Sequence, residues 1–383
     1  MYNSNKESSN YIRTWIVVIG VLVGSIATGY AQDAIDERLD SYIDDIESGV
    51  ESRGLEGISG LSALLQPEIE ELRGPQRNPG IDQSLEGILP SVVEAVSHED
   101  SRGIALNALG SIAQLIGPEH AKAYKSIEDH LFMAMTNRSY EVRHRDTAGL
   151  ALEGLSELHE TTVTDIANSA RSEPNPSKSL FSLLAKNCNR YEVARKALLK
   201  LSKDTDSRKR MLVARELVLT REPGDALIEQ LANLAQSDSD DSVRFSAIWT
   251  LRSGYTLSPE LSSRLVTTLA KVIPNTAEPL QNRQAAIGTL SRLVQTEPKY
   301  LSVLAEICQD ESIASSLRGD AIAMLPWASR YSSEVRPIIE AIAQDEDKII
   351  RGAGERGLKI MDRDSRYTRE TPLPGMRRAF EPR

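Results

Sequence analysis

The chain has 383 residues, a formal net charge of −10 and a pI of about 5.3. A protein that tracks a phosphate backbone needs a basic surface, so this charge argues against nucleic-acid binding by the chain as a whole. Apolar residues make up 40% of the sequence but aromatic residues only 5%, so leucine and alanine must supply most of the core. That balance suits thin layers of closely packed helices.

The amino-terminal segment has the pattern of an export signal. Residues 14–32 carry no charge and follow Lys6 and Arg13, and Gly29-Tyr30-Ala31 resembles a cleavage site before Gln32. Because these 19 uncharged residues approach the roughly 20 needed to span a bilayer, an uncleaved anchor is the alternative, and a buried helix of a cytoplasmic protein is a third. Residues 1–31 are therefore predicted to be a signal peptide or membrane anchor. The folded part is expected to be exported, periplasmic or extracellular, or membrane-anchored outside the cytoplasm.

Residues 32–82 are predicted to form amino-terminal helices and a linker. Helical patterns cover 34–50, where acids occupy most exposed turns, and more weakly 57–72. Residues 73–80 are rich in proline and glycine, which is typical of a connection between domains.

A short motif then repeats along the chain. An arginine is followed by a small residue three positions later and a leucine seven positions later, and the clearest arginines are Arg244, Arg283, Arg318 and Arg351. They lie 39, 35 and 33 residues apart, and a period in this range indicates a solenoid in which each unit buries its apolar face against its neighbours. Arg102 and Arg145 begin earlier copies, and Arg210 begins a looser one.

With the acidic turn that precedes the arginine, as in 239–244, the motif resembles the HEAT repeat family, particularly its short bacterial form related to phycobilin-lyase repeats. The resemblance covers about residues 83–361. It implies an all-α fold, a right-handed α-solenoid of stacked antiparallel helix pairs (a HEAT-like superhelix). In this family the arginine bonds acids of its own and the adjacent repeat, and the acids nearby here are Asp241, Glu278, Glu311 and Asp347. Family members are mostly binding scaffolds and a minority are enzymes.

The repeat pattern is interrupted once and then ends. Arg145 and Arg210 are 65 residues apart, and Pro174 and Pro176 break the interval. An irregular section is therefore expected near 160–205, with helices near 161–171, 178–187 and 191–203. Beyond residue 361, three prolines and a low apolar content predict an extended or disordered tail over 362–383.

No catalytic, metal-binding or cofactor-binding motif is present, so none of these sites is expected. The five histidines all lie between residues 98 and 159 but form no i, i+4 pair. Cys188 and Cys308 are 120 residues apart, about three repeats, whereas a disulfide needs Cα atoms within about 7 Å. Both cysteines are predicted to be buried thiols.

The sequence indicates one candidate binding surface. Counting from each arginine, positions +3, +4 and +7 should face the core, whereas +1, +5, +8, +9 and +12 should face away. In the repeat of Arg145 these outer positions hold Asp146, Glu153 and Glu157, but in later repeats they hold aromatic and basic residues, which are common interface hot spots. The alternative is that Trp249 and Trp327 fill gaps between repeats. The candidate partner-binding residues are Phe245, Trp249, Arg252, Arg292, Trp327, Arg330, Arg356 and Lys359.

These patterns predict a non-catalytic exported scaffold that binds a protein partner through an elongated solenoid surface. It could also serve as a subunit of a membrane-associated complex, tethered through residues 14–32. The alternative is an enzyme of the chromophore-lyase type, which is built on similar repeats. A protein partner is expected, without nucleic acid or a small-molecule cofactor.

Overall fold

A computed structural model describes residue 41 and residues 80–370, apart from 221, 254, 256 and 329–332. The predicted signal peptide or anchor, the helices predicted at 34–50 and 57–72, and residues 371–383 lie outside this part or almost wholly outside it. In the described residues every regular element is a helix, which confirms the predicted all-α fold. None of these helices is both long and apolar enough to span a membrane.

The chain divides into two compact units, residues 1–162 and 163–383. In the first unit, α5 packs against α4, α6 and α7, and α6 also packs against α7. Leu85, Leu109 and Leu131 are among its fully buried core residues. Its helices are α4 (Gly80–Ala95), α5 (Arg102–Ile116), α6 (Ala121–Thr136) and α7 (Val142–Gly154), and α8 (Glu160–Ser172) crosses the boundary.

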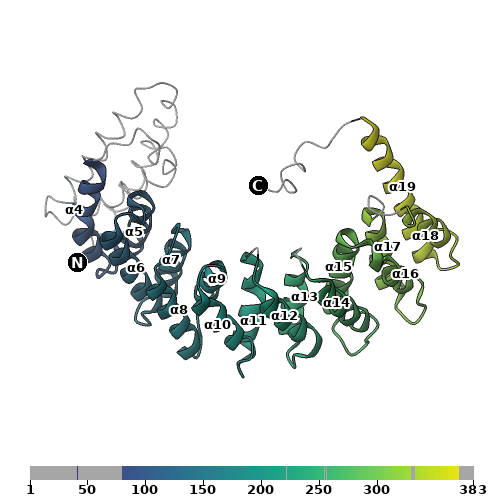
Figure 1. The fold of residues 1–383 in the computed structure, drawn as a ribbon, viewed down its shortest axis with the longest axis horizontal. Coiled ribbons are helices and arrows are strands. Elements are labelled where there is room, and N and C mark those ends of the chain that lie inside the picture. Colours follow the sequence, from purple (N-terminus) through teal and green to yellow (C-terminus); the bar gives the residue numbers. More distant parts are fainter. Residues whose placement is uncertain are drawn as a thin grey trace, which may run out of the picture. The chain divides into compact units, whose positions relative to one another are not determined.

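The second unit is built of helix pairs in two layers. The second helices of the pairs are the odd-numbered ones, α9, α11, α13, α15, α17 and α19. Each packs on the next helix of this series (Figure 1). The first helices are the even-numbered ones, α10, α12, α14, α16 and α18. They form the other layer, and each packs on the second helix of its own pair. The bounds are α9 (Lys178–Asn187), α10 (Glu192–Leu201), α11 (Ser207–Glu216), η1 (Leu217–Leu219), α12 (Asp225–Ser237), α13 (Asp241–Leu251), α14 (Pro259–Val272), α15 (Leu280–Thr296), η2 (Pro298–Tyr300), α16 (Leu301–Gln309), α17 (Ser315–Ala328), α18 (Val335–Ile342) and α19 (Lys348–Glu370).

Local sequence explains where these helices start and how they pack. The carboxylate of Asp240 accepts hydrogen bonds from the backbone N–H groups of Ser242 and Val243, which caps α13. The small residue at +3 of the motif lies where two helices approach closely. At Gly354 in α19, an added Cβ would lie 2.7 Å from the backbone nitrogen of Ala343, so only glycine fits there.

The interval between Arg145 and Arg210 holds four helices, α8 to α11, close to the expected positions. Arginine is the fourth residue of α7 and of every odd-numbered helix from α11 to α19, but in α9 the fourth residue is Phe181. Phe181 is fully buried. If Phe181 is counted, the 65-residue gap divides into 36 and 29 residues, so the arginine period failed because one repeat uses an apolar residue instead.

The final helix corrects the predicted carboxy-terminal boundary. α19 continues to Glu370, whereas the tail was expected to begin at residue 362. No proline or glycine occurs between Leu358 and Thr371, so nothing in the backbone stops the helix there despite the polar composition.

Candidate protein-binding face

The repeated arginines are structural and do not form an open anion-binding row. The Nε of Arg244 donates to Glu278 in the next repeat at 2.7 Å, and its Nη1 donates to the carbonyl oxygen of Asp238 at 2.6 Å. Arg244 also pairs with Asp241, and its side chain is only 13% exposed. Its partners therefore lie in its own and the adjacent repeat, as the family resemblance implied.

The other arginines of the series make related contacts. Arg283 donates to the carbonyl oxygen of Ile273 at 2.6 Å, and Arg351 to that of Asp345 at 2.7 Å. Arg318 lies 3.6 Å from the Asp347 carboxylate. These side chains are therefore engaged within the solenoid and are not available to bind a ligand.

We define the basic–aromatic face as the described candidate residues on second helices α13 to α19: Phe245, Trp249, Arg252, Arg292, Trp327, Arg356 and Lys359. At the first helix of this face, α13, two aromatic rings and the arginine that follows the helix stack together. The rings of Phe245 and Trp249 stack with centroids 6.1 Å apart, and the Arg252 guanidinium carbon lies 5.3 Å from the Trp249 centroid. Trp249 nevertheless exposes 50% of its surface.

The remaining candidates lie on the three following second helices. Trp327 on α17 is 43% exposed, and Arg356 and Lys359 on α19 are exposed. Arg292 on α15 is half-buried, and its Nη1 donates to the side chain of Gln295 at 3.2 Å. Arg330 lies outside the described residues. Trp249 and Trp327 therefore remain accessible, and they do not act solely as filling between repeats.

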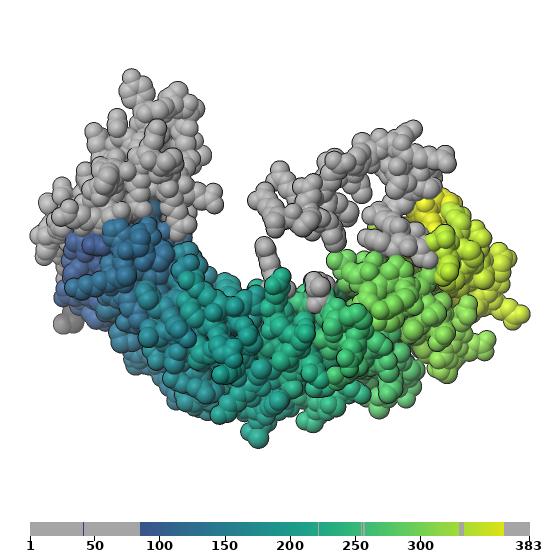
Figure 2. Space-filling model, in the orientation of Figure 1, coloured from purple at the N-terminus to yellow at the C-terminus, as the bar shows by residue number. Residues whose placement is uncertain are grey.

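Exposed apolar residues concentrate on this layer of the second unit. Among its described residues, six large apolar side chains are exposed, and all six lie on second helices or on η1, which directly follows α11. In Figure 2 helices α13 to α17 fall within the teal-green to light green part of the second unit. Exposed apolar side chains gathered on one layer are typical of an interaction surface. The six are Val218, Leu219, Trp249, Leu280, Trp327 and Ile349.

Charge separates this face from the rest of an acidic protein. Positions +1, +5, +8 and +9 of α13, α15, α17 and α19 contain no acid, nor do the matching positions in the repeat of Arg210. Within the described part of the chain, the side chains of Arg252, Arg356 and Lys359 form no ion pair or hydrogen bond. The carboxylates of Asp238 and Glu278 are instead committed to Arg210 and Arg244. The face therefore presents cations that lack acidic partners.

Two hollows lie elsewhere, one in each unit. In the first unit, a hollow of about 590 Å³ is lined by apolar residues of α4, such as Leu89 and Val93, by His130 of α6 and by His120, which directly precedes α6. His120 Nδ1 lies 2.7 Å from the Glu86 carboxylate. In the second unit, an open hollow of about 390 Å³ lies beside the Arg210–Asp238 pair.

Neither the histidines nor the cysteines form a reactive centre in the described residues. No cluster of histidine, cysteine, aspartate or glutamate there could hold a metal ion. Cys188 and Cys308 are buried and unlinked, as predicted. Burial raises the pKa of the Cys308 thiol to about 12, and burial likewise raises that of Cys188, which disfavours the thiolate in both.

Sequence reasoning missed Asp238, the partner of Arg210. The available signal was an aspartate or asparagine at the start of six of the intra-repeat turns, whose side chain accepts the backbone N–H two residues later. This turn recurs at Asn137, Asp204, Asp238, Asn275, Asp310 and Asp345.

Comparison with known proteins supports the fold. No protein-family model and no curated protein matches the chain. Kap121p bound to Pho4p matches 85% of this chain at 12% identity with a TM-score of 0.52, and a Kap121p mutant matches 91% at 13% identity with a TM-score of 0.54. The karyopherin Kap121p bound to the SUMO protease Ulp1p matches 85% at 13% identity with a TM-score of 0.50. The matched regions cover 38%, 41% and 38% of those chains, so this protein spans about two-fifths of their length. Both the repeat geometry and these similarities give the chain a HEAT-like α-solenoid fold.

Proposed function

We propose that this protein is a non-catalytic scaffold that binds a protein partner across the basic–aromatic face. One observation carries the proposal: all six exposed large apolar side chains of the second unit's described residues lie on second helices or η1. Leaving Trp249 and Trp327 half-exposed costs hydrophobic stabilisation, which a partner that covers them would recover. The similar solved structures include Kap121p bound to Pho4p and to Ulp1p, which adds support from the same architecture.

The proposed scaffold acts outside the cytoplasm, either free or as part of a membrane-associated complex. Support for this location comes from the uncharged residues 14–32 and the small residues before Gln32. Amino-terminal sequencing of protein from native cells tests it, with Gln32 expected as the first residue. An intact amino terminus in the soluble cytoplasmic fraction would contradict export.

Site-specific photocrosslinking tests the binding face. Ala323 is exposed on α17, one helical turn before Trp327, whereas Lys271 is exposed on first helix α14. With p-benzoylphenylalanine at each position in turn, we expect a protein adduct in native cells from 323 and not from 271. Mass spectrometry identifies the adduct, and the double variant Trp249→Ala/Trp327→Ala should abolish it. Equal adducts from both positions, or an adduct unaffected by the double variant, would contradict the proposed face.

A further inference from the structure

We infer that the basic–aromatic face recognises an extended acidic peptide segment with two apolar side chains about six residues apart. This inference rests on the proposed function and specifies the partner's chemistry. It follows from three features of the face: a preordered arginine, the separation of two tryptophans, and a second group of cations farther along.

Arg252 is held in a defined orientation. Its guanidinium lies 5.3 Å from the Trp249 ring on one side and reaches α15 on the other. At Gly288 of α15, an added Cβ would lie 3.4 to 3.7 Å from three guanidinium atoms, so the group rests against that glycine. A planar guanidinium that is already ordered loses little entropy when it binds a carboxylate through two parallel hydrogen bonds.

The protein supplies no carboxylate to Arg252 within its described residues, although the repeated arginines Arg210 and Arg244 each have one. Arg252 can therefore bind a carboxylate of the partner. An apolar side chain close to that carboxylate in the partner would pack on the indole of Trp249. A partner carboxylate two residues before or after an apolar residue meets both requirements, because side chains i and i+2 of an extended chain lie on the same face.

The two tryptophans set a spacing. Trp249 is on α13 and Trp327 is on α17, and α15 lies between these helices. Neighbouring helices pack about 8–10 Å apart, so the two indoles are about 20 Å apart. An extended chain advances about 3.3 Å per residue, so two apolar side chains that reach both indoles are about six residues apart.

Arg356 and Lys359 extend the pattern by one more helix, because α19 packs on α17. One helix spacing corresponds to about two to four residues of extended chain, and an even number keeps the side chains on one face, so a second acid is expected about two or four residues beyond the second apolar side chain. The expected peptide therefore has an acidic residue near each end and, between them, two apolar residues about six positions apart.

Single-stranded nucleic acid also combines negative charge with flat surfaces that stack on aromatic rings. The observations favour a peptide. Four of the six exposed apolar residues of this layer, Val218, Leu219, Leu280 and Ile349, are aliphatic and offer no stacking surface to bases, whereas apolar peptide side chains can pack on them. Nucleic acid is therefore an outcome to be tested and not the proposed ligand.

Fluorescence anisotropy with the full-length protein tests the inference. The probe is a labelled peptide with leucines six residues apart, aspartates at both expected positions, and a glycine–serine background. We expect binding at low salt that weakens about tenfold or more for the same peptide with lysines in place of the aspartates. Peptides with leucines three residues apart should bind about fivefold or more weakly than the six-residue peptide. Labelled oligo(U) should bind more weakly still.

Variants locate the site. Trp327→Ala should weaken the six-residue peptide about fivefold or more, but it should scarcely change binding of a peptide that lacks the second leucine. Arg252→Gln should remove the preference for the aspartate near the first leucine, and Arg252→Lys should restore it only in part because lysine lacks the planar fork. Arg264→Gln, on exposed first-helix residue Arg264, is the matched control and should leave binding unchanged. Circular dichroism checks the fold of each variant.

The outcomes separate this inference from the proposed function. Equal binding of acidic and basic peptides, indifference to leucine spacing, or tighter binding of oligo(U) would overturn the inferred peptide chemistry. If the adduct at residue 323 still forms and still depends on the tryptophans, the scaffold function stands with a partner of other chemistry. Loss of that adduct together with all peptide binding would overturn both.

Discussion

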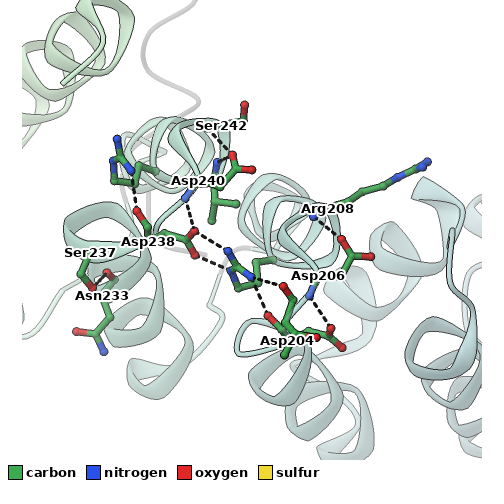
Figure 3. Close-up of polar contacts among 12 residues, drawn as sticks. Asp204, Asp206, Arg208, Asn233, Ser237, Asp238, Asp240 and Ser242 are labelled. Carbon is green, nitrogen blue, oxygen red and sulfur yellow. Dashed lines mark hydrogen bonds and ion pairs between the residues drawn. The ribbon is translucent and has the colours of Figure 1, made fainter. Parts of the chain in front are cut away.

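Arg210 on α11 clasps Asp238 in the turn of the next repeat with two parallel hydrogen bonds (Figure 3). The Nε and Nη2 atoms lie 2.6 and 2.7 Å from the two carboxylate oxygens. Nη1 donates to the carbonyl oxygen of Asp204 at 2.8 Å, in the turn just before α11. One guanidinium thus ties its own turn to the turn of the next repeat, the nearest-neighbour coupling that gives a solenoid its stability.

Arg210→Ala should lower the free energy of unfolding by about 1–3 kcal/mol, because the largely buried Asp238 carboxylate would lose its charged donors. Arg244→Ala should have a similar effect for the same reason. Arg264→Ala is the control: Arg264 and Glu229 form an exposed pair, worth less than about 1 kcal/mol. Urea unfolding followed by circular dichroism measures all three. Equal stability of Arg210→Ala and wild type would exclude the clasp as a stabilising contact.

Acid should destabilise the second unit through these carboxylates. Burial raises the pKa of Asp238, but the Arg210 hydrogen bonds and the Asp240 backbone N–H outweigh it, so the pKa lies below its ordinary value. The pKa of Glu278 is lowered similarly, since bonds from Arg244 and Asn282 outweigh burial. A depressed carboxylate pKa stabilises the fold above the unfolded-state value of about 4 and loses that contribution as pH falls through the folded-state value.

The melting temperature of the wild type should therefore fall as the pH drops from about 5 to about 3. Asp238→Asn should be less stable than wild type at pH 7 but should lose less stability over the same acid range, because one titrating group is gone. Thermal unfolding at a series of pH values measures both. Parallel curves for the two proteins would show that Asp238 does not contribute to the acid response.

Gly354 and Gly352, two residues apart on α19, should respond oppositely to alanine. Gly354→Ala should destabilise the protein by about 1–3 kcal/mol, because the new Cβ would lie 2.7 and 2.9 Å from backbone atoms of Ala343, which cannot move aside alone. At Gly352 the nearest atom is the flexible Arg356 guanidinium at 3.4 Å. Gly352→Ala should therefore be neutral or stabilising by up to about 1 kcal/mol through helix propensity. Thermal melts of the two variants decide the point.

Cys188 and Cys308 should resist maleimide in the native protein at neutral pH. Both are buried, and burial raises both thiol pKa values, so little thiolate is present or accessible. Mass spectrometry should find no modification of the folded chain and two modifications after denaturation in guanidinium chloride. Rapid native labelling of either cysteine would contradict its burial in the core.

The repeat architecture was predictable because its signals are local. The spacing of apolar residues over a few helical turns shows which side of a helix is buried. The motif of Arg244, Ala247 and Leu251 therefore identified the second helices without knowledge of their neighbours. Prediction failed where the local signal changed. The repeat of α9 was missed because it has Phe181 in place of the arginine. The end of α19 was placed too early because the helix continues through a polar sequence to Glu370.

The sequence by itself determined that this is an all-helical repeat protein and which helix positions point away from the core. Only the tertiary structure decided that Arg210 bonds Asp238, that Trp249 and Trp327 stay exposed, and that Arg252 rests against Gly288. These relationships join residues up to 36 positions apart, as from Arg252 to Gly288. They depend on how each helix pair is rotated and shifted against the next, and that geometry arises from the packing of whole repeats, which no single helical pattern encodes.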